Sequence, residues 1–238
     1  MLFSVVIPLF NEERRLPKTA QAIFDFLRNN NKAQTELIFV DDGSSDSTAS
    51  LLEQYKKIYD FRVISYEQNR GKGYAVKQGA LAATGDWVIF FDIDLATPLE
   101  EFSNLLNFMK PDDHIIIGSR RLASSKIKKY ESGIRTFLGQ GFTKLSNILV
   151  PGVTDFTCGF KCFSREAVRK IFSVAKIDRW GFDTELLYIA RLKKIAIRQM
   201  PVVWSHDTDS RVNVFKAVVS SFKELIEMKL NQIKGLYK

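Results

Sequence analysis

The stretch GDWVIFFDID (residues 85–94) indicates the class of fold, because it joins a short apolar run to a pair of carboxylates. The run from Trp87 to Phe91 is wholly apolar and has the length of a strand buried on both faces of a parallel sheet. Asp92 and Asp94 follow it directly, with one apolar residue between them. Ligands of open α/β sheets bind where the strands end. This stretch therefore predicts a central strand with a binding site at its end.

Similar apolar runs surround this strand in the first half of the chain. They are FSVVIPL from Phe3, ELIFVDD from Glu36, FRVISY from Phe61 and HIIIGS from His114. Amphipathic stretches lie between the runs, at Leu16 to Asn29, Thr48 to Tyr59, Gly73 to Ala83 and Glu100 to Met109. Strands that alternate with helices predict an α/β fold with a mainly parallel sheet flanked by helices.

The second half of the chain has a looser pattern. A basic loop from Arg120 to Arg135 precedes three stretches with helical spacing and one strand. The helices are expected at Thr136 to Val150, Arg165 to Phe172 and Phe182 to Leu192, and the strand at Ile195 to Trp204. No linker rich in Gly or Ser separates the two halves, so residues 1–210 are expected to form one domain.

The tail, residues 211–238, has the pattern of a basic amphipathic helix. Its apolar residues share one helical stripe: Val212, Phe215, Val219, Phe222, Ile226, Leu230 and Ile233. Six basic residues against two acidic ones give the tail a charge of +4. Such a helix either packs on the core or lies in the interface of an anionic membrane.

The composition excludes several classes of protein. With 238 residues, 45% of them hydrophobic, the chain can bury one sizeable core and is not expected to be disordered. Two cysteines, Cys158 and Cys162, are too few for a disulfide framework. The chain has no apolar run of about 18 residues, the length that would predict a membrane span. We therefore expect a cytosolic protein, or one that sits on a membrane without crossing it.

The net charge of +8, from 35 Lys and Arg against 27 Asp and Glu, favours an anionic partner. Only this charge supports an interpretation as a nucleic-acid-binding module, because the chain has no helix-turn-helix, zinc or RNP signature. A dinucleotide oxidoreductase is disfavoured as well, because PLFNE (residues 8–12) stands where a G-x-G-x-x-G motif would follow the first strand.

Two acidic motifs carry candidate chemistry. Asp92 and Asp94 can both reach Mg²⁺ or Mn²⁺ if the chain turns there, and such an ion neutralises a departing diphosphate. The alternative is a turn that ends the strand. In the segment VDDGSSDST (residues 40–48), capping of the next helix accounts for one or two residues. It leaves Asp41 and Asp42 as paired acceptors for a base and a ribose.

Taken together, these motifs resemble glycosyltransferase family 2, the inverting transferases of the GT-A type. The matching segments are VVIPLFNEE (5–13), VDDGSSDST (40–48), NRGKGYAVKQGALAATGDWVIFFDID (69–94), GSRR (118–121), DFTCGFKCFSREA (155–167) and RWGFDTELL (179–187). Within the family the chain looks most like the polyprenyl-phosphate sugar synthases. The DLATP segment (94–98) is most similar to the dolichyl-phosphate beta-glucosyltransferases.

The resemblance implies roles for the residues that match these motifs. The nucleotide would be held by Pro8, Asn11, Glu12, Asp41, Asp42, Lys72 and Asp92. Asp92 and Asp94 would ligate Mg²⁺ or Mn²⁺ on the diphosphate. Ala96 stands where mannosyl-type synthases often carry Gln, and this fits the glucosyl pattern with UDP-glucose as the donor.

For the acceptor, the resemblance implies a polyprenyl (dolichyl) phosphate bound by Arg120, Arg135 and Arg211, with Asp155 orienting that region. A phosphate is already anionic and needs no general base. A soluble glycan or protein hydroxyl would need one, with Asp155, Asp183 and Glu185 as candidates. The expected place is the cytoplasmic face of a membrane. Peripheral contact and recruitment by a membrane protein are both open.

Overall fold

A seven-stranded sheet forms the centre of the computed structural model, which describes residues 1–29, 32–129, 133–206 and 214–238. The strand order is β3-β2-β1-β4-β7-β5-β8. These strands are β1 (Leu2–Leu9), β2 (Gln34–Asp41), β3 (Arg62–Ser65), β4 (Trp87–Phe90), β5 (Ile115–Ser119), β7 (Lys161–Ser164) and β8 (Ile197–Pro201). Only β7 runs antiparallel to its neighbours within this sheet. The predicted mainly parallel sheet is confirmed.

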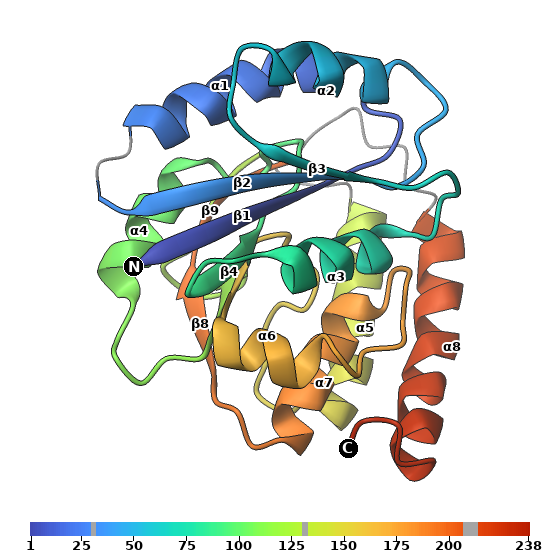
Figure 1. Cartoon of the computed structure of the whole chain (residues 1–238). Helices are drawn as coiled ribbons and strands as arrows, with labels where there is room; N and C mark the ends of the chain where they lie inside the picture. The colour runs from blue at the N-terminus through green and yellow to red at the C-terminus, as the bar shows by residue number, and fades with distance from the viewer. Residues whose placement is uncertain (30–31, 130–132, 207–213) are drawn as a thin grey trace.

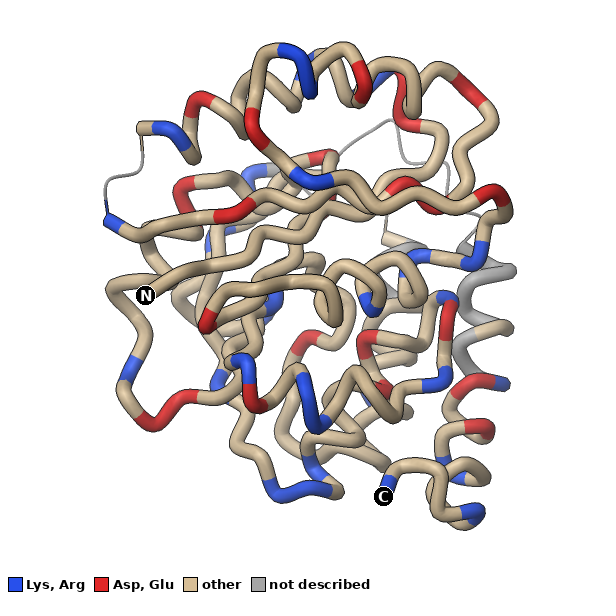
Figure 2. The backbone as a smooth tube through the Cα atoms, in the orientation of Figure 1, with Lys and Arg blue, Asp and Glu red and all other residues tan. Residues whose placement is uncertain are grey.

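Helices cover both faces of the sheet (Figure 1). They are α1 (Leu16–Asn29), α2 (Thr48–Lys56), α3 (Lys72–Ala82), α4 (Glu100–Phe108), α5 (Gly133–Leu149), α6 (Arg165–Ile171), α7 (Phe182–Leu192) and α8 (Val214–Ile233). One core contains α1, α2 and α4, and the other contains α3, α5, α6, α7 and α8. In β1, Phe3, Val5, Ile7 and Leu9 point into one core and Val6 points into the other, as the strand period requires. Charged residues lie mainly in helices and loops (Figure 2).

The structure differs from the sequence-based expectation in the second half. The predicted strand Ile195 to Trp204 is two strands, because β8 ends at Pro201 and β9 (Val203–Ser205) joins a different sheet. There β9 pairs with β6 (Lys126–Lys129), which lies inside the predicted basic loop. Neither β6 nor β7 was predicted, since each has only four residues and both contain lysines.

Helix α8 packs against α5 and α7 through a different face from the predicted stripe. Leu225 and Met228 are buried, whereas the predicted stripe residues Ile226, Leu230 and Ile233 are exposed. Ile226, Leu230 and Ile233 do share a face, but that face points away from the core. Val212 lies outside the described residues, and the side chains of Phe215, Val219 and Phe222 are not described. Across the described ranges, no helix is both long enough and apolar enough to span a bilayer.

Helix α3 approaches β1 closely at Gly79. A Cβ atom added there would lie 2.3 Å from Cγ1 of Val6 and 3.0 Å from Cγ2 of Val40. Both valines have stiff, fully buried side chains. We expect Gly79→Ala to lower the free energy of unfolding by about 1–3 kcal/mol despite the better helix propensity of Ala. Urea unfolding measures this value.

Gly141 in α5 is the matched control, because a Cβ added there meets nothing within 4 Å. Gly141→Ala is expected to stabilise the protein by about 0.5–1 kcal/mol. Equal changes in the free energy of unfolding for Gly79→Ala and Gly141→Ala would show that the close approach of α3 to β1 does not exclude a Cβ atom at residue 79.

Candidate functional site

The loops after β1 and β2 are joined by side-chain and backbone hydrogen bonds. The amide of Asn11 donates to Ser44 Oγ at 2.9 Å, and Asn11 Oδ1 accepts from the amide of Ser45 at 2.8 Å. Asn11 has a φ of 54°, a left-handed conformation that Asn tolerates. The amide of Glu12 donates to Thr48 Oγ1 at 2.8 Å. Pro8 lies opposite Val40 in the β1–β2 register, so these predicted residues meet at one sheet edge.

The adjacent carboxylates of Asp41, the last residue of β2, and Asp42, which follows it, have different surroundings. Asp42 accepts four hydrogen bonds, which come from Tyr66 Oη, Asn69 Nδ2 and the amides of Arg70 and Gly71 at 2.7–2.9 Å. The amide of Ser44 donates to Asp41 Oδ1 at 3.1 Å. Within the described ranges, no hydrogen bond reaches Asp41 Oδ2. Asp42 therefore shapes the loop before α3, and Asp41 keeps an acceptor for a ligand.

This loop delivers Lys72 to the end of β4. Gly71 has a φ of 110°, and a Cβ there would lie 2.5 Å from the carbonyl oxygen of Asp178. Lys72 begins α3, and its Nζ lies 2.5 Å from Asp92 Oδ1. Burial lowers the pKa of Lys72, but attraction to Asp92 and then to Asp183 outweighs this and raises it. Lys72 is thus a charged ammonium beside the predicted metal ligands.

Asp92 and Asp94 lie near each other at the end of β4, as the sequence predicted. The pKa of Asp94 is raised, first by burial and then by the negative charge of Asp92, although its Oδ1 accepts from the amide of Ala96. Gly159 packs directly on Asp92, since a Cβ there would come 2.0 Å from Oδ2. Because Gly159 has no Cβ atom, the carboxylate of Asp92 can occupy the space beside it.

The two carboxylates fit a hard divalent cation. The described residues contain no group of three or more His, Cys, Asp or Glu side chains arranged to hold a metal. Mg²⁺ and Mn²⁺ accept oxygen ligands, and Mg²⁺ is commonly bound by one or two carboxylates with waters and substrate phosphates completing the shell. Two mutually repelling carboxylates at a strand end meet that requirement without a third protein ligand.

A buried ion pair between Lys161 and Asp183 lies next to Lys72. The sequence analysis named Asp183 but not Lys161. Lys161 is fully buried in β7, and its Nζ lies 2.5 Å from Asp183 Oδ1 and 2.7 Å from the carbonyl oxygen of Cys158. Burial raises the pKa of Asp183, against the pull of Lys161 and Lys72. The sequence signal was the position of Lys161 inside the apolar segment GFKCF (159–163), since a buried lysine requires an acidic partner.

Glu185 has a structural position rather than one facing the other predicted residues. Its carboxylate accepts from the amides of Lys176 and Ile177 at 2.8–3.0 Å, and from the hydroxyl of Tyr237 at 2.6 Å. It therefore fixes the segment before α7 and the end of the chain.

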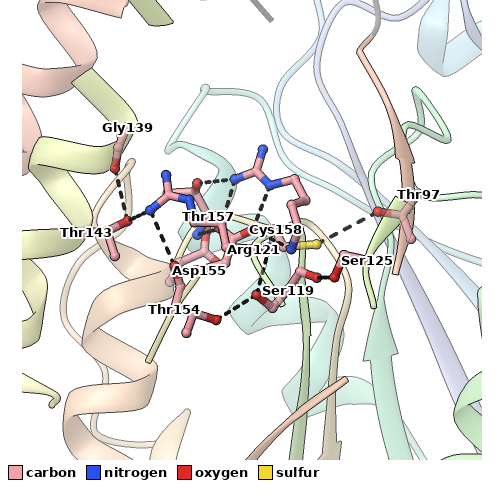
Figure 3. Close-up of polar contacts among 12 residues, drawn as sticks. Thr97, Ser119, Arg121, Ser125, Gly139, Thr143, Thr154, Asp155, Thr157 and Cys158 are labelled. Carbon is pink, nitrogen blue, oxygen red and sulfur yellow. Dashed lines mark hydrogen bonds and ion pairs between the residues drawn. The ribbon is translucent and has the colours of Figure 1, made fainter. Parts of the chain in front are cut away.

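Arg120 and Asp155, which the sequence analysis expects on the acceptor side, form an ion pair with each other; Asp155 is labelled in Figure 3. The guanidinium donates from Nε to Asp155 Oδ2 at 2.7 Å and from Nη2 to Oδ1 at 2.9 Å. It also lies 5.1 Å from the ring centroid of Trp204. Asp155 is fully buried; burial raises its pKa, but Arg120 outweighs this and holds the pKa of Asp155 below its usual range.

Arg121 secures α5 to the same region, with Nη1 donating to Thr143 Oγ1 at 2.5 Å and to the carbonyl oxygen of Thr154 (Figure 3). Arg135 is placed in α5, but the structure does not describe its side chain, and Arg211 lies outside the described residues. The structure therefore brings Arg120 and Asp155 together and does not test the other two arginines.

Removal of the Asp155 carboxylate is expected to destabilise the fold. Asp155→Asn leaves Arg120 without its buried partner, which costs about 3 kcal/mol at neutral pH. Because the folded-state pKa of Asp155 is depressed, its contribution is present above about pH 4 and is lost as the pH falls towards the folded-state pKa. The stability difference from the unsubstituted protein should therefore narrow in urea unfolding below about pH 4.

Glu166→Gln is the control, because Glu166 pairs with Lys170 on the surface. It is expected to leave the midpoint of urea unfolding nearly unchanged, because an ion pair on the surface contributes little to stability. A stability difference for Asp155→Asn that does not change with pH would contradict the ionised pair.

Comparisons with known proteins agree with the motifs. The family model described as Glycosyl transferase family 2 matches residues 4–172. Three similar proteins are named dolichyl-phosphate beta-glucosyltransferase. That of Dictyostelium discoideum is 35% identical over 99% of this chain and 76% of its own length. The human protein is 35% identical over 99% and 77%, and that of Saccharomyces cerevisiae is 33% identical over 100% and 77%.

Solved structures share the fold. Glucosyl-3-phosphoglycerate synthase from Mycobacterium tuberculosis, crystallised with Mn²⁺, UDP and glucosyl-3-phosphoglycerate, has a TM-score of 0.70 at 23% identity, covering 95% of this chain and 79% of that one. TarS of S. aureus (residues 1–349) has a TM-score of 0.61 at 17% identity, covering 97% and 66%. The motifs, the GT-A type fold and these relatives together show that this chain belongs to glycosyltransferase family 2 and is a glycosyltransferase.

Proposed function

We propose that this enzyme transfers glucose from UDP-glucose to a dolichyl or related polyprenyl phosphate, with inversion, to give a β-linked lipid-phosphate sugar. The observation that carries the proposal is the full-length similarity to proteins named dolichyl-phosphate beta-glucosyltransferase. The reaction is placed at the cytoplasmic face of a membrane, with peripheral contact. Recruitment by a membrane protein is compatible with it.

On the donor side, Pro8, Asn11, Glu12 and Asp41 form the edge at which the nucleotide binds. Asp41 offers Oδ2 to the base or ribose, and Asp42 acts through the loop that it holds. Asp92 and Asp94 would hold Mg²⁺ or Mn²⁺, which neutralises charge on the leaving diphosphate when bound. Lys72 lies beside Asp92 and supplies a second positive charge for the phosphates.

On the acceptor side, the state of the carboxylates favours a phosphate over a hydroxyl. Asp155 is occupied by Arg120, and Asp183 Oδ1 by Lys161. Glu185 is occupied by two backbone amides and Tyr237. A hydroxyl acceptor needs a carboxylate to take its proton, whereas an ionised phosphate needs positioning and charge stabilisation. Arg120, Arg135 and Arg211 are the proposed residues for that binding.

Radiolabelled transfer tests the donor, the acceptor and the metal together. We expect label from UDP-glucose, but not from GDP-mannose or UDP-N-acetylglucosamine, to enter a short polyprenyl phosphate with Mg²⁺ or Mn²⁺. A chelator should abolish it. Transfer to a soluble hydroxyl acceptor without any lipid, abolished by Asp155→Asn or Asp183→Asn, would favour the alternative family 2 activity instead.

Asp94→Asn is expected to reduce lipid glucosylation by at least about a hundredfold, because it removes one carboxylate from the ion site. The fold should stay intact, since burial and Asp92 already disfavour the charged form of Asp94. Thermal unfolding and Mn²⁺ titration by electron paramagnetic resonance check fold and ion binding separately from turnover.

Asp60→Asn serves as the matched control, because Asp60 is an exposed aspartate outside the site. It should keep both turnover and Mn²⁺ binding. Retained turnover of Asp94→Asn in saturating Mn²⁺ would remove Asp94 from the metal site.

A further inference from the structure

Helix α8 exposes an apolar stripe to solvent. Ile226, Leu230 and Ile233 have exposed fractions of 53%, 48% and 72%. At roughly 100° per residue they share one side of the helix, opposite the side on which Leu225 and Met228 are buried. Contiguous exposed apolar side chains on a soluble domain mark a contact surface.

Lysines border this stripe on both sides. The helical period places Lys229 along one edge and Lys223 and Lys234 along the other. All three are exposed, and none of them forms an ion pair within the described ranges. Glu227 is the exposed acidic residue of this part of the helix. Figure 2 shows basic and acidic residues on the coloured turns of the helix drawn as α8 in Figure 1.

Two hydrogen bonds hold the stripe in its outward orientation, because they tie α8 and the end of the chain to α7 and the residue before it. Glu224, on the packed face, accepts from the amide of Gly181 at 2.6 Å, and Gly181 directly precedes α7. Beyond the helix, Tyr237 donates to Glu185 of α7 at 2.6 Å. Rotation that buried the stripe would break both bonds. Figure 1 shows α8 along the side towards which the ends of β1 and β2 point.

We propose that the α8 stripe is the face with which the protein lies on an anionic lipid bilayer. Apolar side chains enter the interface, and lysines at the edges reach the head groups while their stems stay in the apolar layer. A second copy of this chain fits less well, because a two-fold contact would bring the bordering lysines together. The identification of this surface is argued from the geometry of α8, whereas its role in catalysis depends on the proposed lipid acceptor.

Co-sedimentation with vesicles tests the surface. The full chain should bind vesicles of phosphatidylcholine with phosphatidylserine more tightly than phosphatidylcholine alone. Ile226→Asn, Leu230→Asn and Ile233→Asn together should weaken binding at least about tenfold, with an unchanged melting temperature because these side chains are exposed. Lys223→Glu, Lys229→Glu and Lys234→Glu together should remove the preference for phosphatidylserine.

The matched control is Ile58→Asn with Leu81→Asn, which removes two apolar side chains exposed elsewhere, at 71% and 44%. It should bind vesicles like the unsubstituted protein. Undiminished binding of the α8 triple-Asn variant would overturn the proposal. A dimer in solution that dissociates in that variant, without vesicle binding by the parent, would overturn it too and make the stripe a self-contact.

Turnover separates this inference from the proposed function. The triple-Asn variant should glucosylate a short, water-soluble polyprenyl phosphate normally and lose turnover with the same lipid embedded in vesicles. Equal loss with both acceptors would contradict a membrane role for the stripe. If the parent binds vesicles through the stripe but no donor labels any polyprenyl phosphate, the surface stands and the proposed function falls.

Discussion

The mutual repulsion of Asp92 and Asp94 at the end of β4 is the constraint around which the site is arranged. Lys72 approaches Asp92 to 2.5 Å, and it does so because α3 begins at the turn made by Gly71. Behind Lys72, the buried pair of Lys161 and Asp183 continues the alternation of charge. Because Lys72 lies beside Asp92 and also attracts Asp94, the two carboxylates can stay close together, and an ion or a diphosphate adds to a prepared set of charges.

The carboxylates divide into those that hold the protein and those that face ligands. Asp42 organises the loop before α3, Asp155 holds Arg120, and Glu185 ties the segment before α7 to the end of the chain. Each of these accepts bonds at both oxygens from the protein itself. This division favours chemistry by positioning and charge stabilisation over general base catalysis.

The sequence predicted the first half of the fold better than the second. Helices α1 and α7 begin and end where the periodicity placed them, and all five strands of the first half exist with shifted ends. Strand β7 was not predicted because its four residues include Lys161. The burial of Lys161 depends on Asp183, which is 22 residues away in the chain. The stripe on α8 was found, but its direction was not, since periodicity defines a face and neighbouring helices decide whether it is covered.

The sequence by itself determined the class of fold, the edge of the sheet that carries the site and the family, because alternating strands and helices bring all strand ends together and the motifs follow those ends. Only the tertiary structure decided which carboxylates remain available. Asp41 and Asp42 are neighbours of the same type, yet Tyr66, Asn69 and two backbone amides bind only Asp42. Those donors lie more than 20 residues further along the chain, and only folding brings them to one carboxylate.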